Sequence, residues 1–187
     1  MELDCSVVDR EARAYERREP FHEVERDQLE TLPDAVAAGD VTWKDVEWVV
    51  WWYFRRHLGA YPHRRRLDVE ERFRSNDWED VREMVEAVGK VDTDEERLAC
   101  LETLDGVDTG VASALLQYLR PDAYLAVDER TWDALRAAGV LSTPYPDPPS
   151  TTAYQRYLER CRTLAERCDV DLQTVYRALW RLGGDES

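Results

Sequence analysis

The sequence predicts an all-α protein of about nine or ten helices. Apolar residues recur at intervals of three and four along most of the 187 residues, which is the spacing of one helix face. No run alternates apolar and polar residues as a half-buried strand would. Glycine or proline follows most of the periodic segments, where these residues end helices. The length suits one compact domain or two small helical lobes around a shared cleft.

The first third of the chain contains three expected helices. Residues 9–18 form a polar, exposed helix, and residues 22–38 form a second helix that ends at Gly39. A third helix over 43–58 begins after Thr42, whose side chain can cap it. This helix is apolar nearly all round after its first turn, so we expect it to be central and buried.

The rest of the chain continues as helices separated by turns. A short extended piece, 124–127, leads into one of them, and the proline-rich loop 141–150 is the one clear linker. The last two helices form an amphipathic hairpin that we expect to be structural. The expected helices are 67–75, 77–88, 93–104, about 109–119, 129–138, about 151–168 and 171–182.

The composition is strongly acidic. Forty Asp and Glu residues outnumber 25 Lys and Arg residues, the formal net charge is −15, and only Lys44 and Lys90 are lysines. Such a surface suits a salt-rich cytoplasm, and an ordinary acidic, well-solvated protein is the alternative. The charge does not exclude a DNA partner, because the Debye length in molar salt is about 3 Å and only contact residues count.

The chain carries no sign of a membrane segment or of a metal site. No stretch approaches 18 consecutive apolar residues, and residues 1–4 lack the layout of a signal peptide. We therefore expect a cytoplasmic protein without a membrane partner. No two cysteines form a C-x-x-C pair, so we expect reduced thiols and no metal. The cysteines are Cys5, Cys100, Cys161 and Cys168.

The most informative stretch is 101–135. Two helices there are joined by a tight turn at Gly106, which permits a backbone conformation that other residues resist. The N–H groups of the turn and of the next helix start favour an anion, and a DNA phosphate is a natural one. Such a contact would hold a duplex without reading its sequence. Asp128 then stands at the start of a third helix.

This stretch resembles the helix-hairpin-helix of the HhH-GPD superfamily of DNA glycosylases, which includes the endonuclease III-like enzymes. The family hairpin reads roughly Leu-Pro-Gly-Val-Gly before a helix of small residues, and this chain has LDGVD at 104–108 and VASALL at 111–116. The family's catalytic aspartate follows in a Val-Asp step, which here is Val127-Asp128. The resemblance implies a single helical domain over 1–187, with two lobes around a cleft. Its helix-hairpin-helix would span about 93–119, and its C-terminal helical hairpin 151–183.

The resemblance implies a monofunctional DNA N-glycosylase that flips its target nucleotide out of the duplex. Asp128 would be the catalytic carboxylate, because it could stabilise the oxocarbenium-like charge on the sugar and orient or activate water. The implied partner is double-stranded DNA, with a monomer as the default state of the protein. The implied contacts to the DNA backbone are Gly106, Val107, Asp108, Thr109 and Gly110.

The chain departs from the family pattern at several positions. Gly110 stands where lysine-bearing members carry their Schiff-base lysine, so we expect no lysine-dependent lyase. Asp108 replaces the second hairpin glycine; the turn can survive this change while phosphate affinity falls. Asp105 replaces the family's proline, a milder change. Cys161 and Cys168 match one spacing of the family's iron–sulfur ligands without the other two, so we expect no cluster and no other cofactor.

Aromatic and basic side chains supply further candidates. Trp132, one turn after Asp128, and Trp51 and Trp52 are candidates for a base pocket, with core packing as the alternative. Four arginines are candidates for phosphate contacts. For the basic stretch 55–66, a solvated loop that pairs with the many acids is the alternative. The four arginines are Arg64, Arg65, Arg66 and Arg130.

Two functions from different classes stay open. The first is a glycosylase, and the second is a non-catalytic helix-hairpin-helix protein that binds DNA or another partner. A catalytic Asp128 should border a cleft deep enough for a base, with aromatic walls. An Asp128 that only caps its helix should lie beneath packed side chains, with its oxygens accepting from the amides of residues 130–131.

Overall fold

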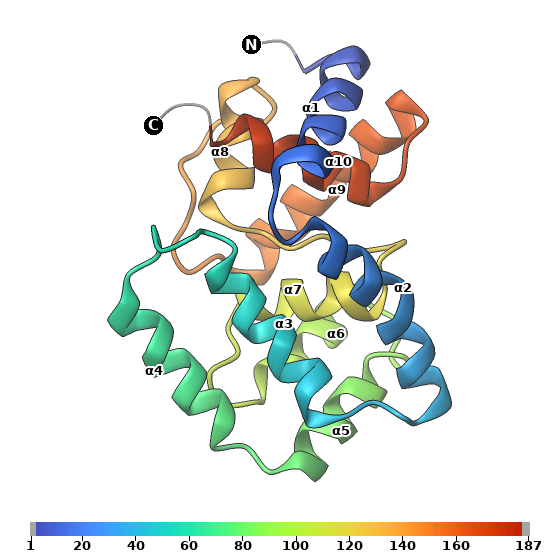
Figure 1. Cartoon of the computed structure of the whole chain (residues 1–187), viewed down its shortest axis with the longest axis vertical. Coiled ribbons are helices and arrows are strands. Elements are labelled where there is room, and N and C mark those ends of the chain that lie inside the picture. The colour runs from blue at the N-terminus through green and yellow to red at the C-terminus, as the bar shows by residue number, and fades with distance from the viewer. Residues whose placement is uncertain (1–2, 185–187) are drawn as a thin grey trace.

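The structure, a computed structural model, describes residues 3–184, which form ten α-helices and no strand. It confirms the all-helical fold predicted from the sequence. Within residues 3–184 no helix is long and apolar enough to cross a membrane. The helices are α1 (Cys5–Arg18), α2 (His22–Ala38), α3 (Trp43–Arg55), α4 (His63–Arg74), α5 (Trp78–Ala87), α6 (Asp94–Glu102), α7 (Thr109–Leu119), α8 (Glu129–Ala137), α9 (Thr151–Cys168) and α10 (Leu172–Leu182) (Figure 1).

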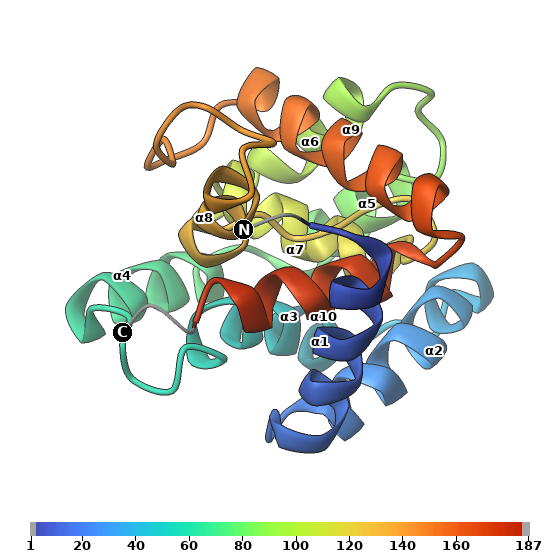
Figure 2. The same ribbon diagram turned by 90° about the horizontal axis from the view of Figure 1, so that it is seen from above.

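Helix α7 is the centre of the fold. All of its residues are buried, and it packs against α2, α3, α6 and α9. Small side chains fill its first half (GVASA, 110–114) and allow neighbouring helices to approach closely. At Gly110, for example, an added Cβ would lie 2.4 Å from the hydroxyl oxygen of Tyr53. Figures 1 and 2 both show α7 in the middle of the molecule.

The two ends of the chain pack together. Helix α1 lies along α10, which also contacts α8 and α9. Figure 1 shows α1, α8, α9 and α10 in the upper part of the molecule, and α4 and α5 in the lower part. The view from above in Figure 2 shows α1 and α10 side by side.

The expectation of reduced cysteines is wrong for two of the four. Cys5 at the start of α1 and Cys168 at the end of α9 form a disulfide, although 163 positions separate them. The reason is tertiary, because α1 packs on α10 and the turn at Asp169 joins α10 to the end of α9. Cys100 and Cys161 are free.

Backbone conformation moves two helix boundaries away from those predicted. Helix α3 ends at Arg55, because Leu58 and Gly59 adopt φ angles of 50° and 93°, and left-handed residues end helices. Helix α4 begins at His63 with Pro62 as its N-cap, so residues 63–66 of the basic stretch are helical, while residues 56–62 form the connection between α3 and α4. Thr42 is the N-cap of α3, as predicted, but its side chain accepts no helix amide; its amide and its hydroxyl both donate to the Asp45 carboxylate, over 2.8 and 2.7 Å.

The segment 124–127 is buried and continues directly into the N-cap of α8. Three tyrosine hydroxyls donate to its carbonyl oxygens over 2.8–3.1 Å. Two side-chain oxygens of α7 accept from its amides over 2.7 and 2.9 Å. These side chains replace the partners that a strand would offer, and they fix the direction in which the chain enters α8. They are Tyr53, Ser113, Gln117, Tyr154 and Tyr157.

Candidate functional site

A cavity of about 580 Å³ opens between α3, α4, α8 and the proline-rich loop. This volume lies in the range of small-molecule sites and is large enough for a nucleobase. The hairpin contributes Asp108 to the wall, and the end of α10 is followed by Gly183 and Gly184, which also line it. The cavity therefore joins elements that are far apart in the sequence.

Aromatic and charged side chains share the walls of the cavity. Tyr53, Tyr61, Tyr145 and His57 supply the polar rings. Carboxylates outnumber arginines in the lining, so the field within the cavity favours a cationic group. The charged side chains are Arg65, Asp108, Asp128, Glu129, Arg130, Asp133 and Asp147.

Asp128 lies at the inner end of the cavity and is only 4% exposed. It is the N-cap of α8 in a capping box. Its Oδ1 accepts from the amide and the hydroxyl of Thr131, over 2.8 and 3.2 Å. Its Oδ2 accepts from a guanidinium nitrogen of Arg56. Asp128 therefore shows part of each expected arrangement: it lines an aromatic-walled cavity, and one of its oxygens caps α8 through the Thr131 amide alone, while the other accepts from Arg56.

Arg56 is the buried partner of Asp128. Its guanidinium lies against four aromatic rings, with centroids 4.2–5.7 Å away, and donates to the hydroxyl of Tyr176 over 2.5 Å. Burial disfavours the charged guanidinium, but Tyr176 and Asp128 outweigh it and raise the pKa of Arg56. The ion pair therefore persists without water. The four rings are Trp52, Tyr53, Tyr176 and Trp180.

The proline-rich loop is tied down on both sides of the cavity. The Trp132 indole donates to the carbonyl of Thr143 over 2.9 Å, and Arg65 donates two hydrogen bonds of 2.6 and 2.7 Å to Asp147. Between these anchors, Tyr145 projects into the cavity. Burial, followed by the charge of Asp128, raises the pKa of Tyr145, so its hydroxyl remains a hydrogen-bond donor.

His57 lies in the wall between the rings of Trp180 and Tyr61, whose centroids are 5.0 and 6.0 Å away. Burial lowers the pKa of His57 to about 4, although the charge of Asp128 opposes the shift. The imidazole is therefore neutral at physiological pH.

This lowered pKa predicts acid sensitivity. As the pH falls from 6.5 towards 4, the unfolded chain takes up a proton on His57 that the folded protein does not. The free energy of unfolding should then decrease by up to about 3 kcal/mol from this group. Urea denaturation at several pH values should show that the free energy of unfolding decreases less steeply with falling pH for His57→Gln than for the native chain. The exposed His63→Gln should keep the native slope, and equal slopes for all three proteins would contradict the assignment.

The structure brings four of the sequence-predicted residues to the cavity: Asp108, Asp128, Arg65 and Arg130. The other hairpin residues, Gly106, Val107, Thr109 and Gly110, are buried and lie outside its lining.

Gly106 packs directly against the main chain of α4. An added Cβ there would lie 2.7 Å from the carbonyl oxygen of Val69 and 2.8 Å from the amide nitrogen of Phe73. Its φ of 80° is also left-handed. A glycine is therefore required at this turn for both conformation and space.

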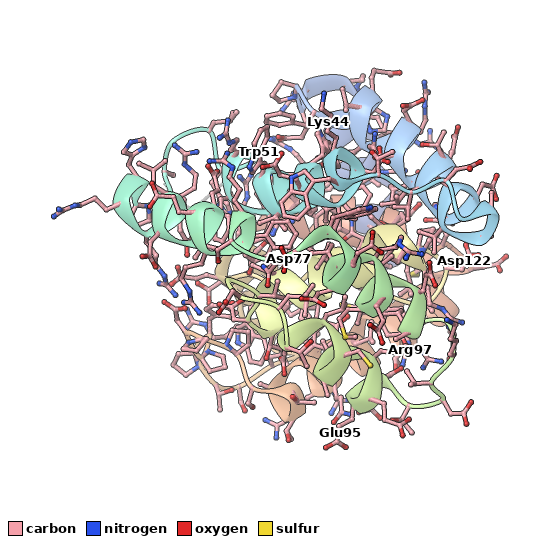
Figure 3. The ribbon with its side chains drawn as sticks, turned by 90° about the horizontal axis from the view of Figure 1, so that it is seen from below. Lys44, Trp51, Asp77, Glu95, Arg97 and Asp122 are labelled. Atoms are coloured by element: carbon pink, nitrogen blue, oxygen red, sulfur yellow. A yellow bond between two sulfur atoms is a disulfide. The ribbon has the colours of Figure 1, made fainter. Side chains whose placement is uncertain are left out.

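The three candidate tryptophans lie outside the cavity lining. Trp132 is 1% exposed beneath the loop, and the indole of Trp52 donates to the buried Glu25 over 2.6 Å. Trp51 lies on the face of α3 that Figure 3 shows from below. Its ring is contacted by the guanidinium groups of Arg55 and Arg74, 4.8 and 5.3 Å from the ring centroid.

The candidate arginines fall into different environments. Arg64 is exposed on α4, and Arg66 pairs with Glu70 over 2.9 Å; neither lines the cavity. Arg65 and Arg130 line it, and Arg65 is paired with Asp147.

Sequence reasoning missed the residues that shape the cavity most. The sequence places Arg56 and His57 in the basic stretch 55–66 and Tyr145 in the proline-rich loop, and it marks none of them as part of a site. The hint in the sequence was the position of these residues, since Arg56 and His57 end a helix that was expected to be buried. Within residues 3–184, no group of three or more His, Cys, Asp or Glu side chains is arranged to hold a metal ion.

Comparison with known proteins does not place the chain in a family. No protein-family model matches it, and no curated protein and no solved structure is significantly similar to it.

Proposed function

We propose that this protein is a monofunctional DNA N-glycosylase with an HhH-GPD-like architecture, in which two groups of helices flank the cavity. One observation carries the proposal: Asp128 and the hairpin residue Asp108 line the same aromatic-walled cavity. Double-stranded DNA would lie across the cavity mouth while a flipped base enters the cavity. The hairpin residues expected to contact DNA are buried apart from Asp108, so the hairpin would position Asp108 in the wall rather than hold the DNA backbone.

The chemistry would be hydrolysis of the N-glycosidic bond. The C1′–N bond breaks, the base leaves with the bonding electron pair and gains a proton, and water adds to C1′ while losing a proton. Positive charge develops on the sugar in the transition state. The carboxylate of Asp128 and the acidic cavity wall would stabilise this charge. The rings of Tyr53, Tyr61 and Tyr145 would contact the base.

DNA binding has to be reconciled with a net charge of −15. Salt screens distant acids, so the groups within contact distance dominate. Arg64 and Arg65 are exposed at the start of α4, and Arg65 lines the cavity. These arginines would meet backbone phosphates, Arg65 by exchanging its pair with Asp147 for a phosphate.

The ion pair with Arg56 favours a second candidate function. One oxygen of Asp128 accepts from Arg56 and the other from Thr131, so part of its charge is already compensated. Asp108 likewise uses one oxygen to cap α7, over 3.0 Å to the amide of Val111. A DNA-binding protein that keeps the scaffold without catalysis would have no need of a free carboxylate.

Single-turnover excision on a panel of damaged duplexes at high salt separates the two candidates. Asp128→Asn keeps the shape and an acceptor for the Thr131 amide but removes the charge. We expect it to lower the excision rate at least about 100-fold, with duplex affinity unchanged. Asp122→Asn, which alters an exposed acid outside the cavity lining, should excise the base at close to the native rate. Equal rates for native protein and Asp128→Asn would remove Asp128 from the mechanism. Binding without excision in the native protein would select the second candidate.

A further inference from the structure

Arg130 differs from the other arginines at the cavity. Arg65 is paired with Asp147, and Arg56, behind the wall, is paired with Asp128. Arg130 is half-buried in the cavity wall. In the described part of the chain, no carboxylate lies within ion-pair distance of its guanidinium. A partly desolvated cation without a counter-charge costs stability, and a bound anion would offset that cost.

The guanidinium of Arg130 is held in a defined plane. Its Nε donates to the carbonyl oxygen of Trp180 over 2.6 Å. The guanidinium carbon, Cζ, lies 4.2 Å from the centroid of the Trp180 ring. These two contacts leave both Nη groups without a hydrogen-bond partner among residues 3–184. Burial lowers the pKa of Arg130, which agrees with a partly desolvated site. A planar, oriented guanidinium with free Nη groups matches the geometry of a phosphate.

The chain after α10 is shaped around this side chain. A Cβ at Gly183 would lie 2.0 Å from the carbonyl oxygen of Arg130, and one at Gly184 would lie 1.9 Å from its Nη2. The contact at Gly183 is with main-chain atoms, so only glycine fits there, whereas a side chain at Gly184 would displace the guanidinium. Both glycines line the cavity. The two residues therefore pass close to the guanidinium without a side chain that could cover it.

We propose that Arg130 is the phosphate-binding residue of the cavity. Its place two residues after Asp128, in the first turn of α8, would set a phosphate beside the sugar on which Asp128 acts. The amides of that first turn add favourable dipoles. Glu129 and Asp133 in the same wall oppose an anion, so affinity would come from direct contact rather than from the overall field. That the bound phosphate belongs to DNA with a flipped nucleotide rests on the proposed glycosylase function. That Arg130 binds a phosphate does not depend on that function.

Two binding measurements at one fixed salt concentration test this proposal and separate the sources of phosphate. In the first, calorimetry compares 2′-deoxyadenosine 5′-monophosphate with 2′-deoxyadenosine. In the second, fluorescence anisotropy follows a short duplex with one abasic site over a range of salt concentrations. Arg130→Gln should weaken mononucleotide binding about tenfold or more and leave nucleoside binding unchanged. It should also lower the salt slope of duplex binding by about one.

Arg160→Gln is the control, because Arg160 is exposed on α9 and lies outside the cavity lining. It should bind both ligands like the native protein. Arg130→Lys keeps the charge but not the planar fork, so it should bind with intermediate affinity. Thermal unfolding without ligand shows whether each variant is folded.

Each outcome has a defined meaning. A loss in both measurements supports a phosphate site that serves DNA, and a loss with duplex alone assigns the site to the DNA backbone. A loss with mononucleotide alone supports the phosphate site and argues against the glycosylase proposal. Native binding of both ligands by folded Arg130→Gln would overturn the inference.

Discussion

Replacement of Arg56 by methionine should lower the free energy of unfolding by about 3–5 kcal/mol. The side chains of Arg56 and Asp128 are 2% and 5% exposed, so the substitution would leave a buried carboxylate without its counter-charge. The methionine retains much of the apolar contact with Trp52 and Tyr53. The loss would therefore report mainly on the uncompensated charge rather than on a cavity.

A double-mutant cycle separates the two effects. In urea denaturation at constant high salt, Arg56→Met combined with Asp128→Asn should recover most of the stability lost by Arg56→Met alone, because the neutral amide tolerates burial better. Arg55→Met is the control on the same helix. It removes a half-exposed partner of Glu70, and Arg66 still donates to that carboxylate. If Arg56→Met and Arg55→Met had equal costs, the buried pair would not be a major stabilising element.

Reduction of the Cys5–Cys168 disulfide should cost up to about 5 kcal/mol of unfolding free energy. The bond closes a loop of 163 positions, and a cross-link over so long a loop restricts the unfolded chain strongly. It also fastens the start of α1 to the end of α9, where Arg167 donates to the carbonyl of Leu3 over 2.5 Å.

Urea denaturation with and without a phosphine reductant measures this effect. The midpoint of the native protein should fall on reduction, whereas Cys5→Ser should have the lower midpoint in both conditions. Cys100→Ser, which removes a free thiol, should behave like the native protein. Thiol titration of the unfolded, non-reduced protein should find two reactive thiols. Four reactive thiols, or a urea midpoint that is the same with and without reductant, would refute the cross-link.

Much of the fold is readable from local patterns. The helix after Thr42 and the helix beginning at Thr109 were predicted at their observed starts, because capping side chains and apolar periodicity act over a few neighbouring residues. The end of α3 was misplaced because Leu58 adopts a left-handed conformation that its residue type rarely favours. The early start of α4 could not be predicted because eight of its twelve residues are Arg, Asp or Glu, and no apolar residue of the helix precedes Leu67.

The candidate site was only partly readable. The family resemblance implied that the hairpin and Asp128 belong to one site, and Asp108 and Asp128 line one cavity. The partner of Asp128 could not be predicted, since Arg56 lies 72 positions away and looked like one more member of a basic stretch. The tryptophans were the conspicuous aromatic residues, yet the cavity is lined by tyrosines from three separate segments, Tyr53, Tyr61 and Tyr145.

The residues alone determined the helical class, the burial of α3 and the presence of a carboxylate at the start of α8. Each of these depends on residue types and on spacing between near neighbours in the chain. Tertiary packing decided the rest: which cysteines form the disulfide, which arginine neutralises Asp128, and which arginine near Asp128 has no ion-pair partner among residues 3–184. These features arise from contacts between segments tens to more than a hundred residues apart. Their free energy depends on burial and distance, which no local pattern encodes.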